Sequence, residues 1–179
     1  MSLIQIHDKQ FMPYISREAI HNRIAEMAQE IDIAYKDLNP LFVCVLNGAF
    51  IFAADLFRAL SIPAEITFVK LNSYEGISST GNVVTTIGIS TQLQNRHLIL
   101  LEDIIDTGKT LHSFIPQLLE QHPASLKLAC LLSKPDALQY DVITDYTGFV
   151  IPENFVVGYG LDYDGLGRNL PDIYTLANQ

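Results

Sequence analysis

The sequence has no tryptophan, two cysteines and few basic residues. Its 179 residues include 11 Lys and Arg against 20 Asp and Glu, for a formal net charge of −9. Binding nucleic acid over a broad surface requires a basic face that displaces counterions from phosphates, so this charge balance argues against a general nucleic-acid-binding protein. A small, locally basic pocket remains compatible with the composition.

Two further absences bear on where the protein works. No apolar run approaches the roughly 20 residues that a membrane span needs, and the N-terminal stretch MSLIQIHDKQFMPY lacks the basic start and apolar stretch of a signal peptide. Cys44 and Cys130 each lie inside an apolar run, which predicts two buried core residues and no disulfide framework. We therefore expect a cytoplasmic protein with no membrane partner.

What is present indicates a folded α/β protein. Hydrophobic residues make up 49% of the chain and charged residues 17%, and the length suits one domain over residues 1–179. Continuous apolar runs predict buried strands, and segments with helical spacing of apolar residues lie between them. The expected strands are 41–46, 64–71, 83–89, 97–102 and 125–132; the expected helices begin after Ser16, a residue that suits an N-cap, and span 49–60 and 109–122. This alternation predicts a mostly parallel central sheet flanked by helices.

The C-terminal segment, from about residue 140 to 179, changes character. It contains short strand-like runs, GFVI and FVVGYG, separated by many turns. We expect this segment to form a small cap over the sheet instead of another strand–helix–strand unit.

The run LLEDIIDTGKT (100–110) carries the clearest chemical pattern. It follows an expected strand and leads into a helix, and ligands of such sheets bind beyond the carboxyl ends of the strands. The hydroxyls and backbone N–H groups of Asp106-Thr107-Gly108-Lys109-Thr110 suit a phosphate monoester at a helix start. Glu102, Asp103 and Asp106 would repel phosphate, but they suit sugar hydroxyls or Mg²⁺. The alternative is an acidic strand end followed by an ordinary N-cap, with Lys109 solvated; the glycine spacing of a Walker loop is absent.

This run resembles the phosphoribosyl-diphosphate signature of the type I phosphoribosyltransferases. Three more segments resemble the hypoxanthine-guanine branch of that family: VLNGAF (45–50), NSYEGISSTGNV (72–83) and GFVIPENFVVGYGLDYDGLGRNLPDIY (148–174). They occur in the family's order and cover nearly the whole chain. The resemblance implies the type I phosphoribosyltransferase fold with a C-terminal hood, phosphoribosyl diphosphate and a 6-oxopurine as substrates, and Mg²⁺ as cofactor.

The resemblance also implies roles for the central motif. Glu102 and Asp103 match the acidic pair that holds the ribose hydroxyls and a magnesium shell. Asp106 matches the proposed general base at purine N7, for which the alternative is a capping carboxylate. The four residues after it match the 5′-phosphate loop: Thr107, Gly108, Lys109 and Thr110.

Two loops outside this motif match further parts of the family's site. Leu46, Asn47 and Gly48 match the pyrophosphate loop, where backbone amides bind and a non-proline cis peptide often occurs; the alternative is a plain strand-to-helix turn. Ser73 and Tyr74 match the mobile loop that closes over the site and excludes water. A solvated hairpin loop in the open state is compatible with that role.

The C-terminal motif matches the residues around the base and the leaving group. Phe155 matches the aromatic ring that stacks on the purine, with a core role as the alternative, and Val156 matches the main-chain partner of the base edge. Asp162 matches a metal ligand at the pyrophosphate. Arg168 matches a cation that contacts the leaving pyrophosphate, and surface charge is its alternative.

One position departs from the family's pattern. A gapless reading puts Ile143 where the family often has a lysine that donates to the purine 6-oxo group, and isoleucine cannot donate. Another donor then takes over (a backbone N–H, a water or Lys134), or the base preference differs. The resemblance thus implies a purine-salvage enzyme for hypoxanthine and guanine, usually dimeric or tetrameric. A transferase preferring guanine or xanthine and a phosphoribosyl-diphosphate-sensing regulator of the same fold stay open as alternatives.

Overall fold

The computed structural model describes residues 3–72, 84–87, 89 and 91–177. Its helices are α1 (Arg17–Ala34), α2 (Phe50–Ala59), α3 (Lys109–Leu119) and the 3₁₀ turn η1 (Pro135–Ala137). The strands of its larger sheet are β3 (Leu41–Leu46), β4 (Glu65–Asn72), β5 (Val84–Ile87), β6 (His97–Ile105), β7 (Ser125–Ser133) and β8 (Tyr146–Val150). A smaller sheet contains β1 (Ile4–Ile6), β2 (Lys9–Ile15), β9 (Val156–Val157) and β10 (Ile173–Leu176).

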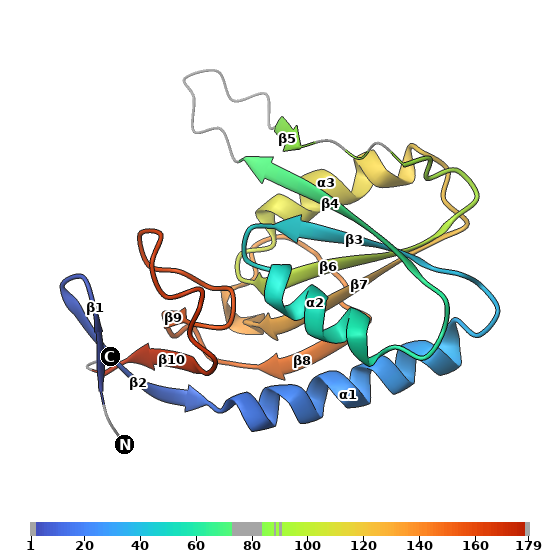
Figure 1. The fold of residues 1–179 in the computed structure, drawn as a ribbon. Coiled ribbons are helices and arrows are strands. Elements are labelled where there is room, and N and C mark those ends of the chain that lie inside the picture. The colour runs from blue at the N-terminus through green and yellow to red at the C-terminus, as the bar shows by residue number, and fades with distance from the viewer. Residues whose placement is uncertain (1–2, 73–83, 88, 90, 178–179) are drawn as a thin grey trace.

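The larger sheet has the order β5-β4-β3-β6-β7-β8 and is parallel except at β5, which pairs antiparallel with β4. Helices α1 and α2 cover one face and α3 covers the other (Figure 1). The predicted α/β class with a mostly parallel sheet is confirmed. No helix in the described part of the chain is both long and apolar enough to cross a membrane.

Alternating side chains of the central strands fill two separate cores. Phe42 and Cys44 of β3 pack with the buried faces of α1 and α2, whereas Val43 and Val45 pack with α3. This alternation follows from the two-residue period of a strand and explains why the central runs are apolar throughout. Both cysteines are buried and free, as predicted.

The first helix forms as its sequence predicts. Ser16 is the N-cap of α1, and its hydroxyl oxygen accepts from the Ala19 N–H at 3.2 Å. The apolar residues spaced along the helix face the core, and Ile20, Met27 and Ile31 are fully buried. Their burial supplies most of the helix's stability, because in folded proteins the packing of an amphipathic face contributes more than intrinsic helix propensity.

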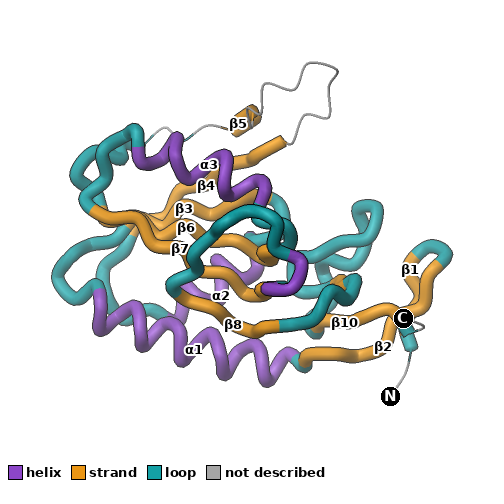
Figure 2. Tube along the Cα trace, turned by 180° about the vertical axis from the view of Figure 1, so that it is seen from behind, coloured by secondary structure: helices purple, strands orange, loops and turns teal. Residues whose placement is uncertain are grey.

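The small antiparallel sheet adjoins the carboxyl ends of the parallel strands (Figures 1 and 2). It differs from the expected cap in two ways. The run at 146–150 is a parallel strand of the central sheet, paired with β7, although the sequence placed it in the cap. In its stead, the N-terminal hairpin of β1 and β2 joins the cap through pairing of β2 with β10. The cap is therefore built from both ends of the chain.

Candidate active site

Three chain segments meet at the carboxyl ends of β3, β6 and β7. They are the turn after β3 (46–48), the acidic end of β6 with the loop that follows it (102–110), and Lys134 directly after β7. Because β6 lies between β3 and β7 in the sheet, the acidic motif is central and the other two segments flank it. The hood loop, defined here as residues 158–168, approaches from the small sheet.

The loop between β6 and α3 borders a small pocket of about 100 Å³. The pocket is lined by Glu102, Ile104, Ile105, Asp106, Thr107, Gly108, Thr110 and Leu111. Gly108 has a left-handed φ of 79°, a conformation that glycine adopts without a steric penalty, and α3 begins at the next residue. Gly108 offers no side-chain cap, and the Thr107 hydroxyl oxygen accepts from the Lys109 N–H at 3.4 Å. The remaining N–H groups of this helix start, together with its positive dipole end, suit an anion.

The acidic pair lies in the last part of β6, which runs three residues further than expected. The Oε2 atom of Glu102 has no contact with solvent and no hydrogen-bond partner in the described structure. Burial raises the pKa of this carboxyl well above its usual range, and the Asp103 charge raises it further. Burial also raises the pKa of Asp103, to about 6, although the Ile104 N–H donates to its Oδ1 at 2.8 Å. The Glu102 Oε2 atom, which is held without a donor, is placed to accept a hydroxyl or contact a cation.

These raised pKa values predict a pH-dependent stability. Between pH 4 and 6 the folded protein keeps the Asp103 proton that the unfolded chain releases, so the free energy of unfolding falls as the pH rises through this window. The ionised carboxylate then costs at most about 3 kcal/mol above pH 6. We expect Asp103→Asn to be more stable than the wild type at pH 7.5 in urea unfolding without divalent cations, with this advantage shrinking steadily as the pH falls toward 4.

A matched control is Asp136→Asn, which changes an exposed carboxylate in η1. That substitution is expected to leave the pH dependence of unfolding intact. An Asp103→Asn variant with an unaltered pH dependence would contradict the assignment of the effect to Asp103.

Asp106 and Lys134 form an ion pair at the edge of the pocket. Lys134 Nζ donates to Asp106 Oδ2 at 2.9 Å; the lysine side chain is 8% exposed, whereas that of Asp106 is 51% exposed. Adjacent strands bring the two together, because Ile105 and Ser133 are register partners of β6 and β7 and each charged residue comes one position later. The pair offers a solvent-accessible carboxylate and a buried ammonium donor side by side.

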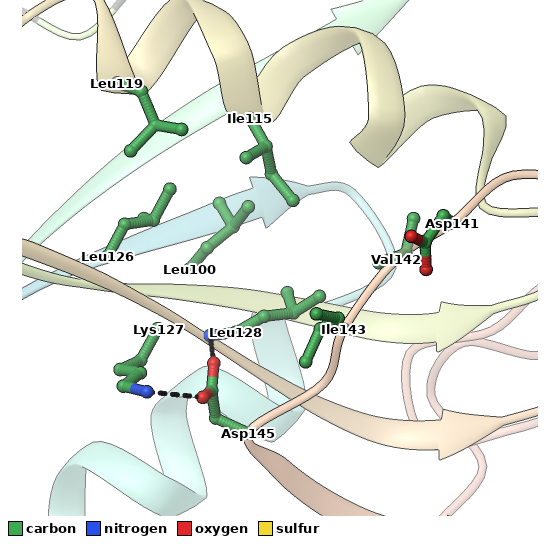
Figure 3. A pocket seen from close by; sticks show the side chains of 10 residues that line it. All are labelled: Leu100, Ile115, Leu119, Leu126, Lys127, Leu128, Asp141, Val142, Ile143 and Asp145. Atoms are coloured by element: carbon green, nitrogen blue, oxygen red, sulfur yellow. Dashed lines mark hydrogen bonds and ion pairs between the residues drawn. The ribbon is translucent and has the colours of Figure 1, made fainter.

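Ile143 does not lie beside the Asp106–Lys134 pair. It is 78% exposed and lines a pocket of about 370 Å³ between α3 and β7, beside Leu128 and across from Ile115 (Figure 3). The gapless reading that put Ile143 in the place of the base-recognising lysine is thus not supported by the geometry. The lysine that contacts Asp106 is Lys134, one of the alternative donors to the purine 6-oxo group named above.

The turn after β3 packs directly on the acidic pair. The Leu46–Asn47 peptide bond is cis, as the resemblance implied. A Cβ atom on Gly48 would lie 1.4 Å from Asp103 Oδ2, so only glycine lets the backbone approach this carboxylate. Asn47 is exposed, and the turn presents its backbone to the same side as Asp103.

The hood loop contributes a carboxylate and a guanidinium group. Arg168 Nη2 lies 2.6 Å from Asp162 Oδ1, and its Nη1 donates to the Gly160 carbonyl at 2.6 Å. Asp162 also accepts from the Gly165 N–H at 2.7 Å. Both charges act on Asp103, since Arg168 lowers and Asp162 raises its pKa. The loop is therefore electrostatically coupled to the acidic pair.

Phe155 and Val156 lie where the small sheet meets the hood. Val156 is buried in β9, and the Phe155 ring is 38% exposed. The ring packs edge-on against Tyr163 at 5.7 Å between centroids and tilted against Phe11 at 6.2 Å. An aromatic ring that is held on one side and accessible on the other suits stacking on a planar base.

The N-terminal hairpin supports this region, which the sequence did not indicate. The Tyr163 hydroxyl donates to Asp8 Oδ1 at 2.7 Å and accepts from Lys9 Nζ at 2.8 Å. His7 packs edge-on to the same ring. Ser73 and Tyr74, the two residues assigned to the closing loop, lie outside the described residues.

The residues fit a magnesium ion held in part by a substrate. In the described part of the chain no group of three or more His, Cys, Asp or Glu side chains is arranged to hold a metal alone. Mg²⁺ commonly keeps several waters and uses one or two carboxylates together with substrate phosphates. The unpartnered Oε2 atom of Glu102, with Asp103 and Asp162 nearby, offers the hard oxygen donors that such an ion prefers.

Comparisons with known proteins agree with this geometry. A family model of the phosphoribosyl transferase domain matches residues 16–164. A hypoxanthine-guanine-xanthine phosphoribosyltransferase of Tritrichomonas foetus is 40% identical over 162 residues, which cover 90% of this chain and 88% of that protein. A hypoxanthine-guanine phosphoribosyltransferase of Aquifex aeolicus is 36% identical over 176 residues, with coverage of 97% and 99%.

Solved structures give the same result. A hypoxanthine-guanine phosphoribosyltransferase from Bacillus anthracis superposes with a TM-score of 0.87 at 35% identity, covering 92% of this chain and 97% of the other. The chain belongs to the phosphoribosyltransferase family. Within that family it belongs with the hypoxanthine-guanine phosphoribosyltransferases, as the motifs predicted.

Proposed function

We propose that this protein moves the phosphoribosyl group of 5-phosphoribosyl 1-diphosphate to N9 of hypoxanthine and guanine, giving the nucleoside monophosphate and pyrophosphate. The observation that carries the proposal is the Lys134–Asp106 pair beside a helix start whose N–H groups suit an anion. A 6-oxopurine presents an acceptor at its 6-oxo group and a proton at the neighbouring N7. A buried ammonium next to an accessible carboxylate matches both groups.

In the proposed reaction, the bond between C1′ and the pyrophosphate oxygen breaks while a bond from C1′ to N9 forms, with inversion at C1′. The purine loses its N7 proton to the Asp106 carboxylate. Lys134 donates to the 6-oxo group, Phe155 stacks on the base, and the Val156 backbone binds the base edge. The 5′-phosphate is bound by the N–H groups and hydroxyls of Thr107, Gly108, Lys109 and Thr110.

The leaving pyrophosphate is bound by Arg168 and by the backbone of Leu46, Asn47 and Gly48. Glu102 and Asp103 accept from the ribose hydroxyls. Mg²⁺, held with the help of Glu102, Asp103 and Asp162, would neutralise charge on the departing group. Ser73 and Tyr74 are assigned to the segment that shields the reacting centre from water.

The test is steady-state kinetics of the purified enzyme with hypoxanthine, guanine, xanthine and adenine. We expect kcat/KM to be highest for hypoxanthine and guanine. Activity with xanthine would agree with the Tritrichomonas foetus relative, whose name includes that base. Reaction with adenine alone would contradict the roles given to Lys134 and Asp106.

The remaining alternative is a regulator that senses phosphoribosyl diphosphate and binds nucleic acid. The net charge of −9 disfavours it. A gel-shift assay beside the transferase assay separates the two, since a regulator would shift DNA or RNA without turning over substrate. We propose no nucleic-acid or membrane partner.

We further propose a cytoplasmic enzyme, in keeping with two buried free thiols, assembled as a homodimer or homotetramer. In a Trypanosoma cruzi relative of 34% identity and TM-score 0.88, the role of the C-terminal region in the oligomeric state has been studied. Size-exclusion chromatography with light scattering tests this assembly. A monomer at micromolar concentration would contradict it.

A further inference from the structure

The hood loop begins with three residues in the left-handed backbone conformation. Gly158, Tyr159 and Gly160 have successive φ values of 101°, 49° and 102°. Glycine adopts this left-handed region readily, but a tyrosine does so only where its surroundings hold it. Backbone bonds fix the loop from within, since the Tyr159 N–H donates to the Leu170 carbonyl at 2.9 Å and the Gly160 N–H donates to the Arg168 carbonyl at 3.0 Å.

The loop approaches the turn after β3 closely at Gly160. A Cβ atom on Gly160 would lie 2.1 Å from the Gly48 carbonyl oxygen, and one on Gly48 would meet Asp103. Asp103, Gly48 and Gly160 are thus stacked in that order. A small displacement of the hood loop changes how far Asp162 and Arg168 lie from the turn assigned to pyrophosphate.

A side-chain hydrogen bond also ties the loop to α2: the Tyr159 hydroxyl donates to Asp55 Oδ2 at 2.5 Å. Tyr159 is 3% exposed, and the Asp55 side chain is 25% exposed. Burial raises the pKa of Tyr159 above its usual range and the Asp55 carboxylate raises it further, so the phenol keeps its proton and acts as a donor. A hydrogen bond from a hydroxyl to a carboxylate is short and directional.

Asp55 lies on the helix that starts at the pyrophosphate turn. Helix α2 begins at Phe50, two positions after Gly48, and Asp55 is in its middle. The bond therefore joins a rigid element that begins beside Gly48 to the residue next to Gly160. Two basic side chains also face Asp55: His21 Nε2 from α1 lies at 3.4 Å and Arg58 Nη1 at 3.7 Å, but these side chains are 52% and 81% exposed.

We propose that Tyr159 is a positioning residue of the reaction: its hydrogen bond to Asp55 holds the hood loop in register with Gly48, so that Arg168 and Asp162 meet the pyrophosphate. The proposal rests on the function proposed above. It assigns the pair to the pyrophosphate half of the site and not to the purine half.

Tyr159→Phe tests the pair by removing one oxygen atom. We expect the KM for phosphoribosyl diphosphate in the forward reaction, and for pyrophosphate in the reverse reaction, to rise about tenfold. The KM for hypoxanthine and the dissociation constant of the nucleoside monophosphate should change less than twofold. A loss of packing alone would not produce this split.

Two controls accompany the variant. Tyr35→Phe alters another buried tyrosine, 5% exposed and packed edge-on to His97 at the far end of α1, and should leave all these constants unchanged. Arg58→Gln removes the exposed cation from Asp55 and should behave in the same way. Asp55→Asn keeps a neutral acceptor for the phenol, so its effect should be smaller than that of Asp55→Ala.

A double-mutant cycle decides between a direct and an indirect effect. If the hydrogen bond carries the effect, Tyr159→Phe/Asp55→Ala raises the KM for phosphoribosyl diphosphate no more than the stronger single variant does. Additive effects, equal losses for pyrophosphate and hypoxanthine, or unchanged constants in Tyr159→Phe would each overturn the proposal. Failure of the proposed function is distinct, because the wild-type enzyme would then not consume phosphoribosyl diphosphate at all.

Discussion

Asp106→Asn is expected to leave the protein folded and to lower kcat with hypoxanthine about 10²-fold or more. Asparagine has nearly the same shape as aspartate, and its amide oxygen still accepts from the Lys134 ammonium that lies 2.9 Å from the carboxylate. It cannot take up the N7 proton. The loss should therefore fall on kcat, with a much smaller change in the KM for phosphoribosyl diphosphate.

The measurement is a spectrophotometric assay of nucleotide formation beside urea unfolding of the same preparations. Asp136→Asn serves as the control, because it changes an exposed carboxylate two positions after Lys134. Near-normal turnover of Asp106→Asn would remove Asp106 from the role of general base. A large drop in unfolding free energy would instead attribute the lost activity to the disrupted ion pair.

Much of the fold could be predicted from local patterns. The spacing of Ile20, Met27 and Ile31 after a serine cap is sufficient to predict α1, since periodicity and capping act within a few turns of chain. The run LFVCVL reads as a strand buried on both faces because side chains of β3 alternate between two cores. Strand and helix in alternation then imply parallel pairing.

The small sheet could not be predicted in this way. Strand β2 pairs with β10, so that Ile15 lies opposite Ile173 at the other end of the chain. Pro13 within β2 also argues against a strand, since proline has no N–H to donate to a sheet. In the structure Pro13 lies opposite Tyr174, where the pairing of β2 with β10 shifts register. Such short strands form because of their partners, and their own sequences carry little of that information.

The candidate site divides along the same line. The acidic residues and the phosphate loop are contiguous in sequence, so one motif predicts them together. The pairing of Asp106 with Lys134 depends on the register of β6 with β7, which local patterns do not fix. The approach of Tyr159 to Asp55, 104 positions away in the sequence, is likewise not indicated by any local pattern.

At Ile143 the sequence led to a wrong assignment. A gapless count from Lys134 assumes that the intervening loop keeps the family's length and path. In this protein the loop folds back onto the phosphate loop, where the Gln139 N–H donates to the Thr107 carbonyl at 3.0 Å, and then turns toward α3. Ile143 therefore lies in the pocket beside α3, and the gapless count wrongly assigned it to the purine site.

Lys134→Met is expected to lower kcat/KM for hypoxanthine about 10²-fold while changing that for adenine much less. The 6-oxo group of hypoxanthine loses its donor, whereas the 6-amino group of adenine gains nothing from an ammonium in the first place. The ratio of kcat/KM for hypoxanthine to that for adenine should therefore fall. Methionine preserves the length and apolar stem of the lysine, so the largely buried position stays filled.

The matched control is Lys127→Met, which removes a lysine from another ion pair of β7. Lys127 Nζ lies 2.7 Å from Asp145 beside the pocket under α3, away from the site (Figure 3). This variant should keep the wild-type ratio of hypoxanthine to adenine turnover. Because Lys134 contacts Asp106 and is proposed to contact the purine, but not phosphoribosyl diphosphate, the KM for phosphoribosyl diphosphate should be nearly constant in both variants. An unaltered hypoxanthine-to-adenine ratio in Lys134→Met would assign the donor to a backbone N–H or a water, and recognition of the 6-oxo group would then not depend on this buried cation.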